Sequence, residues 1–386
     1  MNAVVASYAA SFSRSHTLKA TIAKFADDLP YLREPYSSRS WGHPLHSLCC
    51  YQGKLKPAVA YSLVNLFTDV GMTVLDPLGG VGTVGLEACI QGRQGITNDL
   101  SPLAYAVATP KVRLPKLPEA LEALQRFQSG LSRVSIHESD FEAARFGLNG
   151  CVADFYHPDT LAEVLKARRY FLRLSQPTDS DIFVKAALLH VLHGNRPYAL
   201  SRNSHPITPF HPSGRAIYKP VVEHVRRRIL QLYRSQLPTS YRRGVSYHGD
   251  FRQLAKCHES VDAIITSPPF WGMRFDRPNW LRMWFCGWQA EDFHQTSRAF
   301  LERQQTSSLE VYREFFTACR KLLRPGGLMI LHLGGSDKHD MLATLTAQAK
   351  DQFDLLSIVA EDSTNHERHG IKDKGLTKTH NFIFLQ

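Results

Sequence analysis

The sequence predicts an α/β fold. Short apolar segments typical of buried strands occupy 73–76, 95–99 and 261–266, and each ends at a polar or turn-forming residue. Segments with apolar residues at helical spacing, among them 57–68 and 311–323, alternate with these strands. In such folds the connections after the strands lie at the carboxyl edge of the sheet, where open α/β sheets bind their ligands.

Composition indicates a folded protein with a polyanionic partner. The chain has 386 residues, of which 43% are hydrophobic, so it can form one large domain or two ordinary ones. Its 46 Lys and Arg residues outnumber its 35 Asp and Glu residues, which gives a formal net charge of +11. This excess favours a nucleic-acid partner, and the alternative is a protein that is merely basic.

The cysteines and the apolar segments argue against a metal-binding, membrane-spanning or secreted protein. The seven cysteines form no CxxC pair and no regular spacing, so we expect reduced thiols and no metal site. No apolar run is long enough to span a bilayer, and the N-terminus lacks the pattern of a signal peptide. These patterns predict a cytoplasmic protein that does not contact a membrane.

Three acids follow predicted strands, and the first precedes a glycine-rich turn. Asp76 ends the first strand, and the glycines after it let the backbone approach a ligand closely. Asp99 ends the next strand about twenty residues later, where nucleotide-binding folds place a carboxylate on ribose hydroxyls. Asp250, in a Gly-Asp-Phe sequence, is placed to meet an adenine ring, with a helix N-cap as the alternative. Together they predict a nucleoside cofactor.

The strand at 261–266 ends in Ser267-Pro268-Pro269-Phe270. Two consecutive prolines donate no ladder hydrogen bonds, so the chain leaves the sheet in a rigid turn. The Ser267 hydroxyl and the Pro268 carbonyl can accept hydrogen bonds from an exocyclic amine, and the Phe270 ring can stack on a base taken out of its helix. An ordinary proline-rich turn is the simpler interpretation of this motif alone, and the nucleoside motifs favour the catalytic one.

The region 111–243 has a different character. Helical patterns cover 119–127, 159–174, 181–193 and 219–237, and a long polar loop with prolines and aromatics lies at 193–214. Basic, aromatic and amide side chains in that loop, with lysines of a later loop, are candidates for nucleic-acid contact: Asn195, Arg196, Tyr198, Arg202, His205, Lys372 and Lys378. The alternative is a helical subdomain with a solvated basic face.

Six motifs in this order resemble those of the S-adenosylmethionine-dependent amino-methyltransferases of DNA. They are YQGKLKP at 51–57, DPLGGVGT at 76–83, NDLSP at 98–102, GDF at 249–251, TSPPF at 266–270 and the closing TKTHNFIFLQ. The resemblance implies a Rossmann-like class I methyltransferase sheet, mostly parallel, with one antiparallel strand near the C-terminus. It also implies a methyltransferase domain at 41–110 and 244–386 and a helical insertion for target recognition at 111–243. The resemblance does not cover residues 1–40, whose polar, mixed sequence predicts a partly disordered or helical lead.

The same resemblance implies roles for individual residues. Ser267, Pro268, Pro269 and Phe270 form the catalytic turn. Residues 51–54 and 76–83 hold the methionine part of the cofactor. Asp99 holds its ribose, and Asp250 holds its adenine. The full set expected to bind S-adenosylmethionine is Tyr51, Gly53, Lys54, Asp76, Pro77, Gly79, Gly80, Gly82, Thr83, Asp99, Leu100, Asp250 and Phe251.

The expected activity is direct methyl transfer to the exocyclic amine of a flipped base in double-stranded DNA. Serine at the first motif position resembles the cytosine-N4 members, whereas adenine-N6 members more often have Asp or Asn. The alternatives are an adenine-N6 enzyme, an RNA base methyltransferase, and a DNA-binding protein that keeps the nucleoside pocket without catalysis. A cognate restriction endonuclease is a possible partner.

Overall fold

The computed structural model describes residues 17–38, 41–195, 197–205, 208–256, 258–335, 339–362 and 379–386. Its centre is a seven-stranded sheet in the order β3-β2-β1-β4-β5-β7-β6. The strands are β1 (Thr73–Asp76), β2 (Gln94–Asp99), β3 (Val245–His248), β4 (Val261–Thr266), β5 (Leu323–Gly335), β6 (Leu355–Asp362) and β7 (Thr379–Leu385). β7 runs antiparallel to both of its neighbours, and the other pairs are parallel. The prediction of a Rossmann-like, mostly parallel sheet with one antiparallel strand near the C-terminus is confirmed.

Alternating side chains of the central strands enter two separate cores, because successive residues of a strand point to opposite faces. Leu75 and Ile264 belong to one core, and Val74 and Ile265 belong to the other. The first core is completed by α12 (Glu310–Leu322) and α13 (Met341–Ala349), and the second by α2 (Pro57–Phe67) and the helix at 17–28. The sheet is therefore covered on both faces, so ligands reach it at the ends of its strands.

Two further helices, α3 (Thr83–Ile90) and α4 (Pro102–Val112), follow β1 and β2 as expected for parallel crossovers and pack on β2 and β3. The shorter helices are η1 (Pro30–Leu32), η2 (Pro44–Ser47), η4 (Phe251–Lys256), η5 (Glu291–Phe293), η6 (Thr296–Ala299) and α11 (Leu301–Gln304). None of the helices in the described ranges is both long enough and apolar enough to cross a membrane.

The strand β5 contains Arg324-Pro-Gly-Gly327, a sequence typical of a turn. The strand is nevertheless continuous from Leu323. Val261 pairs with Leu323 and Ala263 with Leu328, so two steps along β4 correspond to five along β5. The proline and glycines form an irregularity inside the strand, where the ladder with β4 is interrupted.

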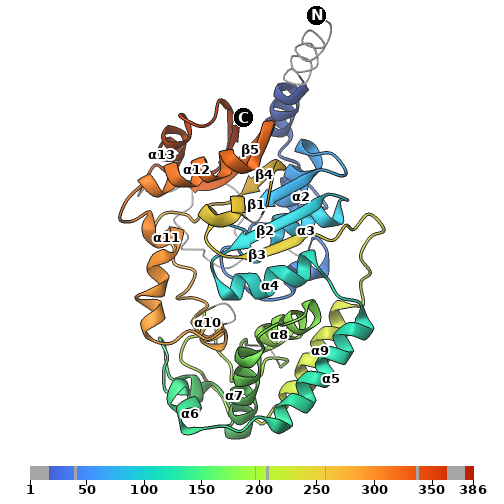
Figure 1. Ribbon diagram of the computed structural model, residues 1–386, viewed down its shortest axis with the longest axis vertical. Coiled ribbons are helices and arrows are strands. Elements are labelled where there is room, and N and C mark those ends of the chain that lie inside the picture. The colour runs from blue at the N-terminus through green and yellow to red at the C-terminus, as the bar shows by residue number, and fades with distance from the viewer. Residues whose placement is uncertain are drawn as a thin grey trace, which may run out of the picture.

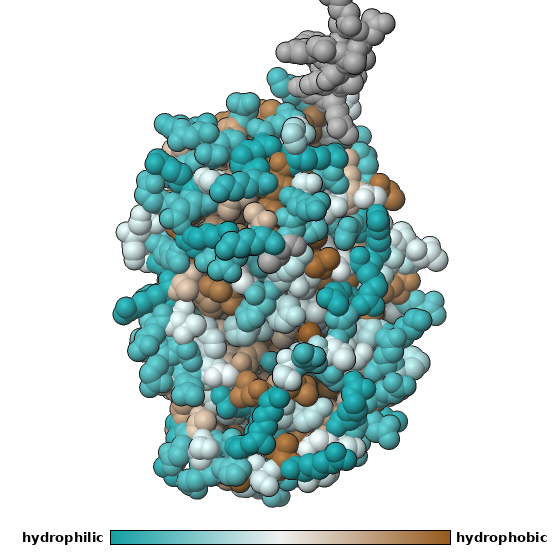
Figure 2. All heavy atoms as spheres, viewed as in Figure 1, coloured by the Kyte–Doolittle hydropathy of each residue, from teal (hydrophilic) through white to brown (hydrophobic). Residues whose placement is uncertain are grey.

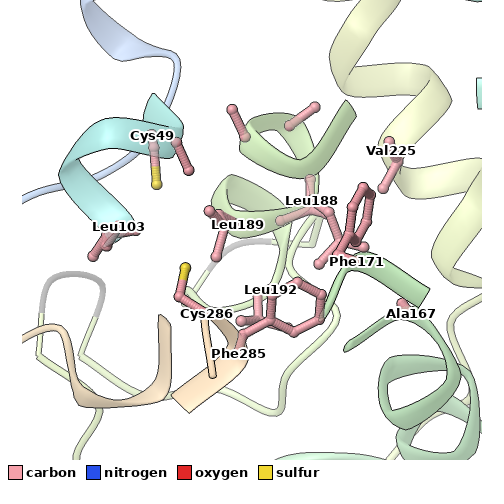
Figure 3. Packing of buried hydrophobic residues seen from close by; sticks show 14 of the residues in the cluster. Cys49, Leu103, Ala167, Phe171, Leu188, Leu189, Leu192, Val225, Phe285 and Cys286 are labelled. Atoms are coloured by element: carbon pink, nitrogen blue, oxygen red, sulfur yellow. The ribbon is translucent and has the colours of Figure 1, made fainter. Parts of the chain in front are cut away.

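The region 111–243 forms a layer of helices on one side of the sheet, in the lower half of Figure 1. Its elements are α5 (Leu117–Arg133), α6 (Glu138–Ala144), η3 (Val152–Phe155), α7 (Pro158–Arg173), α8 (Asp179–Val191) and α9 (Val221–Leu232). α6 was not predicted. Phe171, Leu188 and Val225 of three of these helices share one core with Phe285 of α10 (Trp280–Phe285) and with Leu103 of α4 (Figure 3). We call these helices together with α10 the helical lobe.

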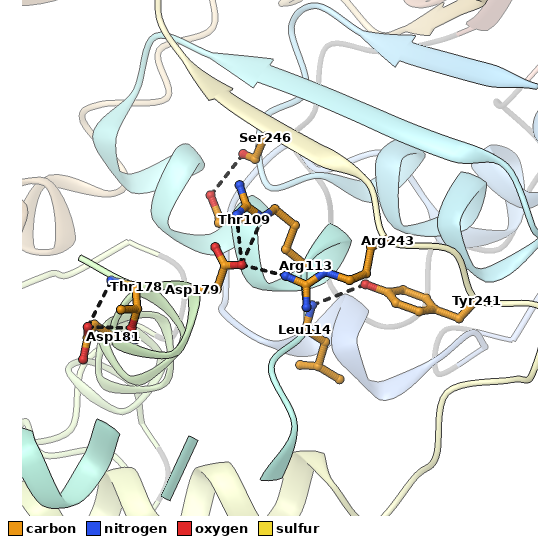
Figure 4. A network of polar contacts seen from close by, with 9 residues as sticks. All are labelled: Thr109, Arg113, Leu114, Thr178, Asp179, Asp181, Tyr241, Arg243 and Ser246. Atoms are coloured by element: carbon orange, nitrogen blue, oxygen red, sulfur yellow. Dashed lines mark hydrogen bonds and ion pairs between the residues drawn. The ribbon is translucent and has the colours of Figure 1, made fainter. Parts of the chain in front are cut away.

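An aspartate holds together the two ends of the region 111–243. Asp179, the first residue of α8, accepts hydrogen bonds from Arg113 at 3.1 Å and from Arg243 at 2.7 Å (Figure 4). Beside it the Leu114 N–H donates to the Tyr241 hydroxyl at 3.3 Å. The chain therefore enters and leaves the region at one place on the sheet, as expected for an insertion between two strands.

Two of the tryptophans that follow the catalytic corner are core residues. Trp280 and Trp284 are buried in the helical lobe, and each indole N–H donates to a backbone carbonyl. Polar side chains cover most of the face seen in Figure 2, and apolar residues are scattered over it in small groups.

Candidate active site

The motifs expected to bind the cofactor and the catalytic turn at 267–270 meet in one cavity at the carboxyl ends of the strands. The cavity encloses about 1020 Å³ of empty space, part of it open to solvent. Its walls include Asp76, Asp99 and Asp250 from the ends of three strands and Ser267 and Pro269 from the corner after β4. Of the residues expected to bind the cofactor, Gly82 is the one that does not line the cavity. Of the catalytic turn, Pro268 and Phe270 do not line it.

The glycine-rich turn is shaped by close backbone contacts. A Cβ on Gly79 would lie 2.0 Å from the Thr97 Oγ1 atom, so only glycine fits there. Gly80 has a φ of 49°, in the left-handed region, and its N–H donates to Asp99 at 2.9 Å. Gly82 packs against Ala108 of α4, which explains its conformation without a ligand.

Asp76 joins the cofactor half of the cavity to the catalytic half. Its carboxylate accepts a 2.6 Å hydrogen bond from the Thr266 hydroxyl at the end of β4 and a weaker one from the Leu78 N–H. Burial raises the pKa of Asp76 to about 7, despite these hydrogen bonds. The bond from Thr266 fixes the residue before Ser267 relative to the glycine-rich turn.

Asp99 lies at the centre of the cofactor wall. The Gly80 and Ser101 N–H groups donate to its two oxygens at 2.9 and 2.7 Å. Burial raises the pKa of Asp99 to about 6. The neighbouring Asn98 amide donates to the carbonyls of Pro77 and Gly249, which ties the turn after β1 to the end of β3. A carboxylate held by backbone N–H groups keeps lone pairs for ribose hydroxyls.

Asp250 and Phe251 have further contacts that the sequence did not predict. Arg252 pairs with Asp250 at 2.8 Å, and its guanidinium lies over the Phe251 ring at 4.5 Å. Phe251 also packs edge-to-face on Phe315 of α12. Phe251 therefore contributes to the core of the sheet as well as to the cavity wall.

The motif at 51–54 forms another wall. The Tyr51 ring stacks on Phe275 with 6.1 Å between ring centroids, and burial raises the pKa of its hydroxyl. Gly53 has a φ of 79°, and a Cβ there would overlap the Phe275 ring. The Lys54 ammonium donates to the His46 carbonyl at 2.9 Å. This wall is thus built against Phe275, a residue that follows the catalytic corner.

The Ser267 hydroxyl is oriented by a buried histidine. Its Oγ lies 3.1 Å from the His332 carbonyl oxygen and 3.2 Å from His332 Nδ1. The second ring nitrogen of His332 lies 3.1 Å from His380 Nδ1. Burial lowers the pKa of His332 to about 3, so its ring is neutral. When the serine hydroxyl donates to the carbonyl, its oxygen stays an acceptor for a ligand N–H.

Phe270 contacts the sheet rather than the cavity. A Cβ on Gly334 would lie 2.4 Å from the Phe270 ring, so the ring rests directly on the β5 backbone. The ring also lies 6.1 Å from His332, centroid to centroid. The role expected for Phe270, stacking on a target base, stays a prediction.

Several polar atoms of the cavity lack partners among the described residues. They are Thr83 Oγ1, Asn98 Oδ1 and Glu302 Oε1, all of which belong to residues that line the cavity. Buried polar groups are normally hydrogen-bonded, so unpaired ones around a cavity indicate a polar ligand. S-adenosylmethionine fits this chemistry, because its ribose hydroxyls and ammonium group donate hydrogen bonds and its positive charge suits the acidic wall.

The sequence interpretation missed one side of the cavity. Phe275, Asp276, Met283, Phe300 and Glu302 all line it, and all follow the catalytic corner. These residues lie neither in a glycine-rich turn nor at the end of a predicted strand, so no local sequence pattern indicates that they line a site. Asp276 is paired with Arg274, so Glu302 is the carboxylate that makes this side acidic.

The candidates for nucleic-acid contact are only partly described. Arg196, Lys372 and Lys378 lie outside the described residues. Asn195 is exposed, and Tyr198 is partly exposed and stacks on His190. Arg202 and His205 have structural contacts: Arg202 donates to the carbonyls of Gly214 and Asp154, and the His205 carbonyl is bound by His193. Contact with nucleic acid stays a prediction for all seven.

Comparison with known families gives one match. Residues 46–135 match the model of UPF0020, described as an RMKL-like methyltransferase domain. The matched segment contains β1, β2 and the first three of the six motifs, which contribute most of the cofactor half of the cavity. A search of curated proteins finds no match.

Comparison with solved structures gives distant likenesses. TrmN from Thermus thermophilus is 15% identical, with a TM-score of 0.35, and the alignment covers 89% of this chain and 51% of that one. The rRNA methyltransferase aviRa from Streptomyces viridochromogenes is 10% identical, with a TM-score of 0.34 and coverages of 92% and 93%. Aeropyrum pernix fibrillarin, solved with bound S-adenosyl-L-methionine, is 14% identical, with a TM-score of 0.22 and coverages of 42% and 51%. This chain thus spans about half the length of the TrmN and fibrillarin chains.

Likenesses this distant assign neither a substrate nor a residue role to this chain. The narrower expectation of a DNA cytosine-N4 enzyme is not supported by the family match either, because the matched model is described as a methyltransferase domain without a substrate. Residues 46–135 match a methyltransferase domain, and the mostly parallel sheet and the acidic cavity are consistent with one. These findings support a methyltransferase that uses S-adenosylmethionine, as the sequence predicted.

Proposed function

We propose that this protein transfers a methyl group from S-adenosylmethionine to an exocyclic amine of a base in nucleic acid. The observation that carries the proposal is the shared cavity, in which Ser267 and the cofactor acids Asp76 and Asp99 lie on adjacent walls. The hydrogen bond from Thr266 to Asp76 holds these walls together. The net charge of +11 supports a polyanionic substrate.

The residues act by positioning. The target amine donates an N–H group to Ser267 Oγ, which lines the cavity, and this turns the nitrogen lone pair toward the cofactor. The Pro268 carbonyl does not line the cavity, so its expected role as a second acceptor stays a prediction. The bound cofactor supplies an electrophilic methyl group on a sulfonium. A nitrogen–carbon bond forms as the carbon–sulfur bond breaks, and the amine then loses a proton to solvent. No cysteine takes part, because the attacking atom belongs to the base.

RNA is the first substrate class to test, because no comparison supports DNA in particular. DNA with cytosine N4 as the target is the second candidate, favoured by serine at the first position of the Ser-Pro-Pro-Phe corner. Adenine N6 in either nucleic acid offers the same exocyclic amine. The basic loop at 193–214 and the helical lobe beside it are the proposed surface for the substrate.

The test is methyl transfer from labelled S-adenosylmethionine to total RNA and to double-stranded DNA, followed by mass spectrometry of the nucleosides. We expect one methylated amino-base and a loss of roughly 100-fold or more in kcat for Ser267→Ala, with cofactor affinity kept. Ser132→Ala, on the exposed face of α5, is the matched control. Cofactor binding without transfer to either nucleic acid would favour the non-catalytic alternative. Unchanged turnover in Ser267→Ala would rule out the proposed role of the corner.

A further inference from the structure

Glu302 is a buried carboxylate whose presence in the cavity has no structural explanation. It is the second residue of the short helix α11, its side chain lines the cavity, and the residue is 7% exposed. Its Oε1 atom has no hydrogen-bond partner in the part of the chain that the structure describes. Backbone N–H groups of Phe275 and of Glu302 itself lower its pKa, but they supply no positive charge.

Two acids near Glu302 add negative charge, and the nearby arginine is paired elsewhere. Asp99 and Asp276 both raise its pKa, after burial, which has the largest effect. Arg274 is close enough for Glu302 to raise its pKa, yet its guanidinium is held by Asp276 in a pair with a 2.8 Å bond. Asp276 is therefore a neutralised acid, whereas no ion pair involving Glu302 is found among the described residues.

An unpaired buried carboxylate destabilises a protein, so it is expected where a ligand supplies the missing charge. S-adenosylmethionine carries two cationic groups, the ammonium of its methionine part and the sulfonium. A neutral base amine carries none. Tyr51, which is assigned to the methionine part, is close enough for Glu302 to raise the pKa of its hydroxyl.

We propose that Glu302 binds a cationic group of the cofactor and so selects a charged sulfur nucleoside over an uncharged one. This inference rests on the proposed function, because it requires S-adenosylmethionine in the cavity. Glu302 thus joins Asp76, Asp99 and Asp250 as a carboxylate proposed to bind the cofactor. It comes from the segment after the catalytic corner. In the apoprotein the carboxylate is uncompensated, and in the complex it is paired.

Calorimetric titration at about pH 8 tests the proposal with three ligands that differ in charge. S-adenosylmethionine has both cationic groups, S-adenosylhomocysteine has the ammonium alone, and 5′-methylthioadenosine has neither. For Glu302→Gln we expect affinity for S-adenosylmethionine to fall roughly 10- to 100-fold, and affinity for 5′-methylthioadenosine to stay within about threefold. A matching fall for S-adenosylhomocysteine would identify the ammonium as the bound group, and an unchanged affinity would identify the sulfonium.

The matched control is Glu122→Gln, which removes the same charge from the exposed face of α5 and leaves all three affinities unchanged. An equal loss for all three ligands, or no loss for S-adenosylmethionine, would overturn the role of Glu302 while the proposed function stands. Failure of the wild-type protein to bind S-adenosylmethionine would overturn the proposed function and this inference with it.

The melting temperature of the apoprotein gives a second readout. A role of Glu302 in folding would change this temperature in the opposite direction to the one that we expect. Because glutamine has the same shape without the uncompensated charge, we expect apo Glu302→Gln to melt about 2 °C or more above the wild type at about pH 8. Saturating S-adenosylmethionine should reduce or invert that difference. A lower melting temperature in the apoprotein would show that Glu302 is needed for folding and would overturn the proposal.

Discussion

The helical lobe and the cavity use charged side chains in opposite ways. In the lobe, Arg169 pairs with Asp140 and Arg126 pairs with Asp181. The buried Arg282 donates to the carbonyls of Leu189 and His193. These charged groups of the lobe thus have partners inside the protein, although Arg282 Nη1 has none among the described residues.

In the cavity, three carboxylates have pKa values raised by burial, namely Asp76, Asp99 and Glu302. The recorded hydrogen bonds of Asp99 come from backbone N–H groups, and those of Asp76 come from a hydroxyl and a backbone N–H. No described residue forms an ion pair with these three acids, so they favour a cationic or hydroxyl-rich ligand. Residue type alone does not mark the site, since both regions contain acids and bases, and Asp250 and Asp276 of the cavity are themselves paired with arginines. The three acids without an ion pair mark it.

The largest expected effect tests this contrast directly. Asp99→Asn should weaken binding of S-adenosylmethionine by roughly 100-fold, because an amide accepts less well than a carboxylate and adds an N–H₂ group beside the Gly80 and Ser101 donors. Calorimetric titration measures the loss, and circular dichroism checks that the fold is kept. Asp140→Asn in the helical lobe is the control and should leave binding unchanged. Equal effects of the two substitutions on cofactor affinity would remove the distinction between the regions.

Much of the cofactor wall could be predicted from the sequence because local rules determine it. The strand ending at Asp76, the tight turn at Gly79 and the strand ending at Asp99 each follow from an apolar run or from glycine chemistry within a few residues. Parallel pairing of β1 with β2 and β4 then brings the strand ends together. The position of Ser267 in the cavity follows from the same topology.

The remaining features depend on contacts between distant segments. Arg324-Pro-Gly-Gly327 is typical of a turn, yet pairing with β4 draws it into β5. α6 has few apolar residues, and its place depends on contacts such as the Arg169 pair with Asp140. Glu302 reaches the cavity only because the chain after the corner returns to it, and no pattern around this residue indicates that return.

A change of pH should separate apoprotein stability from cofactor affinity. The folded pKa values of Asp76 and Glu302 are about 7 and that of Asp99 is about 6, each above the ordinary range of about 4. A carboxyl with a raised folded pKa contributes stability that is fully present below its unfolded pKa and is lost as pH rises through the folded value. Between about pH 4 and 7 these acids should therefore destabilise the apoprotein progressively.

Cofactor affinity should change in the opposite direction, because S-adenosylmethionine pairs with the ionised acids. We expect the dissociation constant to fall about tenfold between roughly pH 5.5 and pH 8, measured by titration in buffers of equal ionic strength. Affinity for 5′-methylthioadenosine should change less, because it carries no positive charge. A pH-independent affinity for S-adenosylmethionine would show that these carboxylates are not its partners.

The smallest effect is expected in the helical lobe, at the junction that Asp179 forms with Arg113 and Arg243. The three side chains are 20%, 39% and 56% exposed, so solvent screens these ion pairs. Asp179→Ala should therefore lower the free energy of unfolding by only about 1 kcal/mol, measured by urea denaturation, with cofactor affinity unchanged. Because Asp179 bridges the two ends of the region 111–243, the loss should come mainly from that junction. A larger loss that also weakened binding of S-adenosylmethionine would mean that the lobe holds the cavity in shape, and the two regions would then be one functional unit.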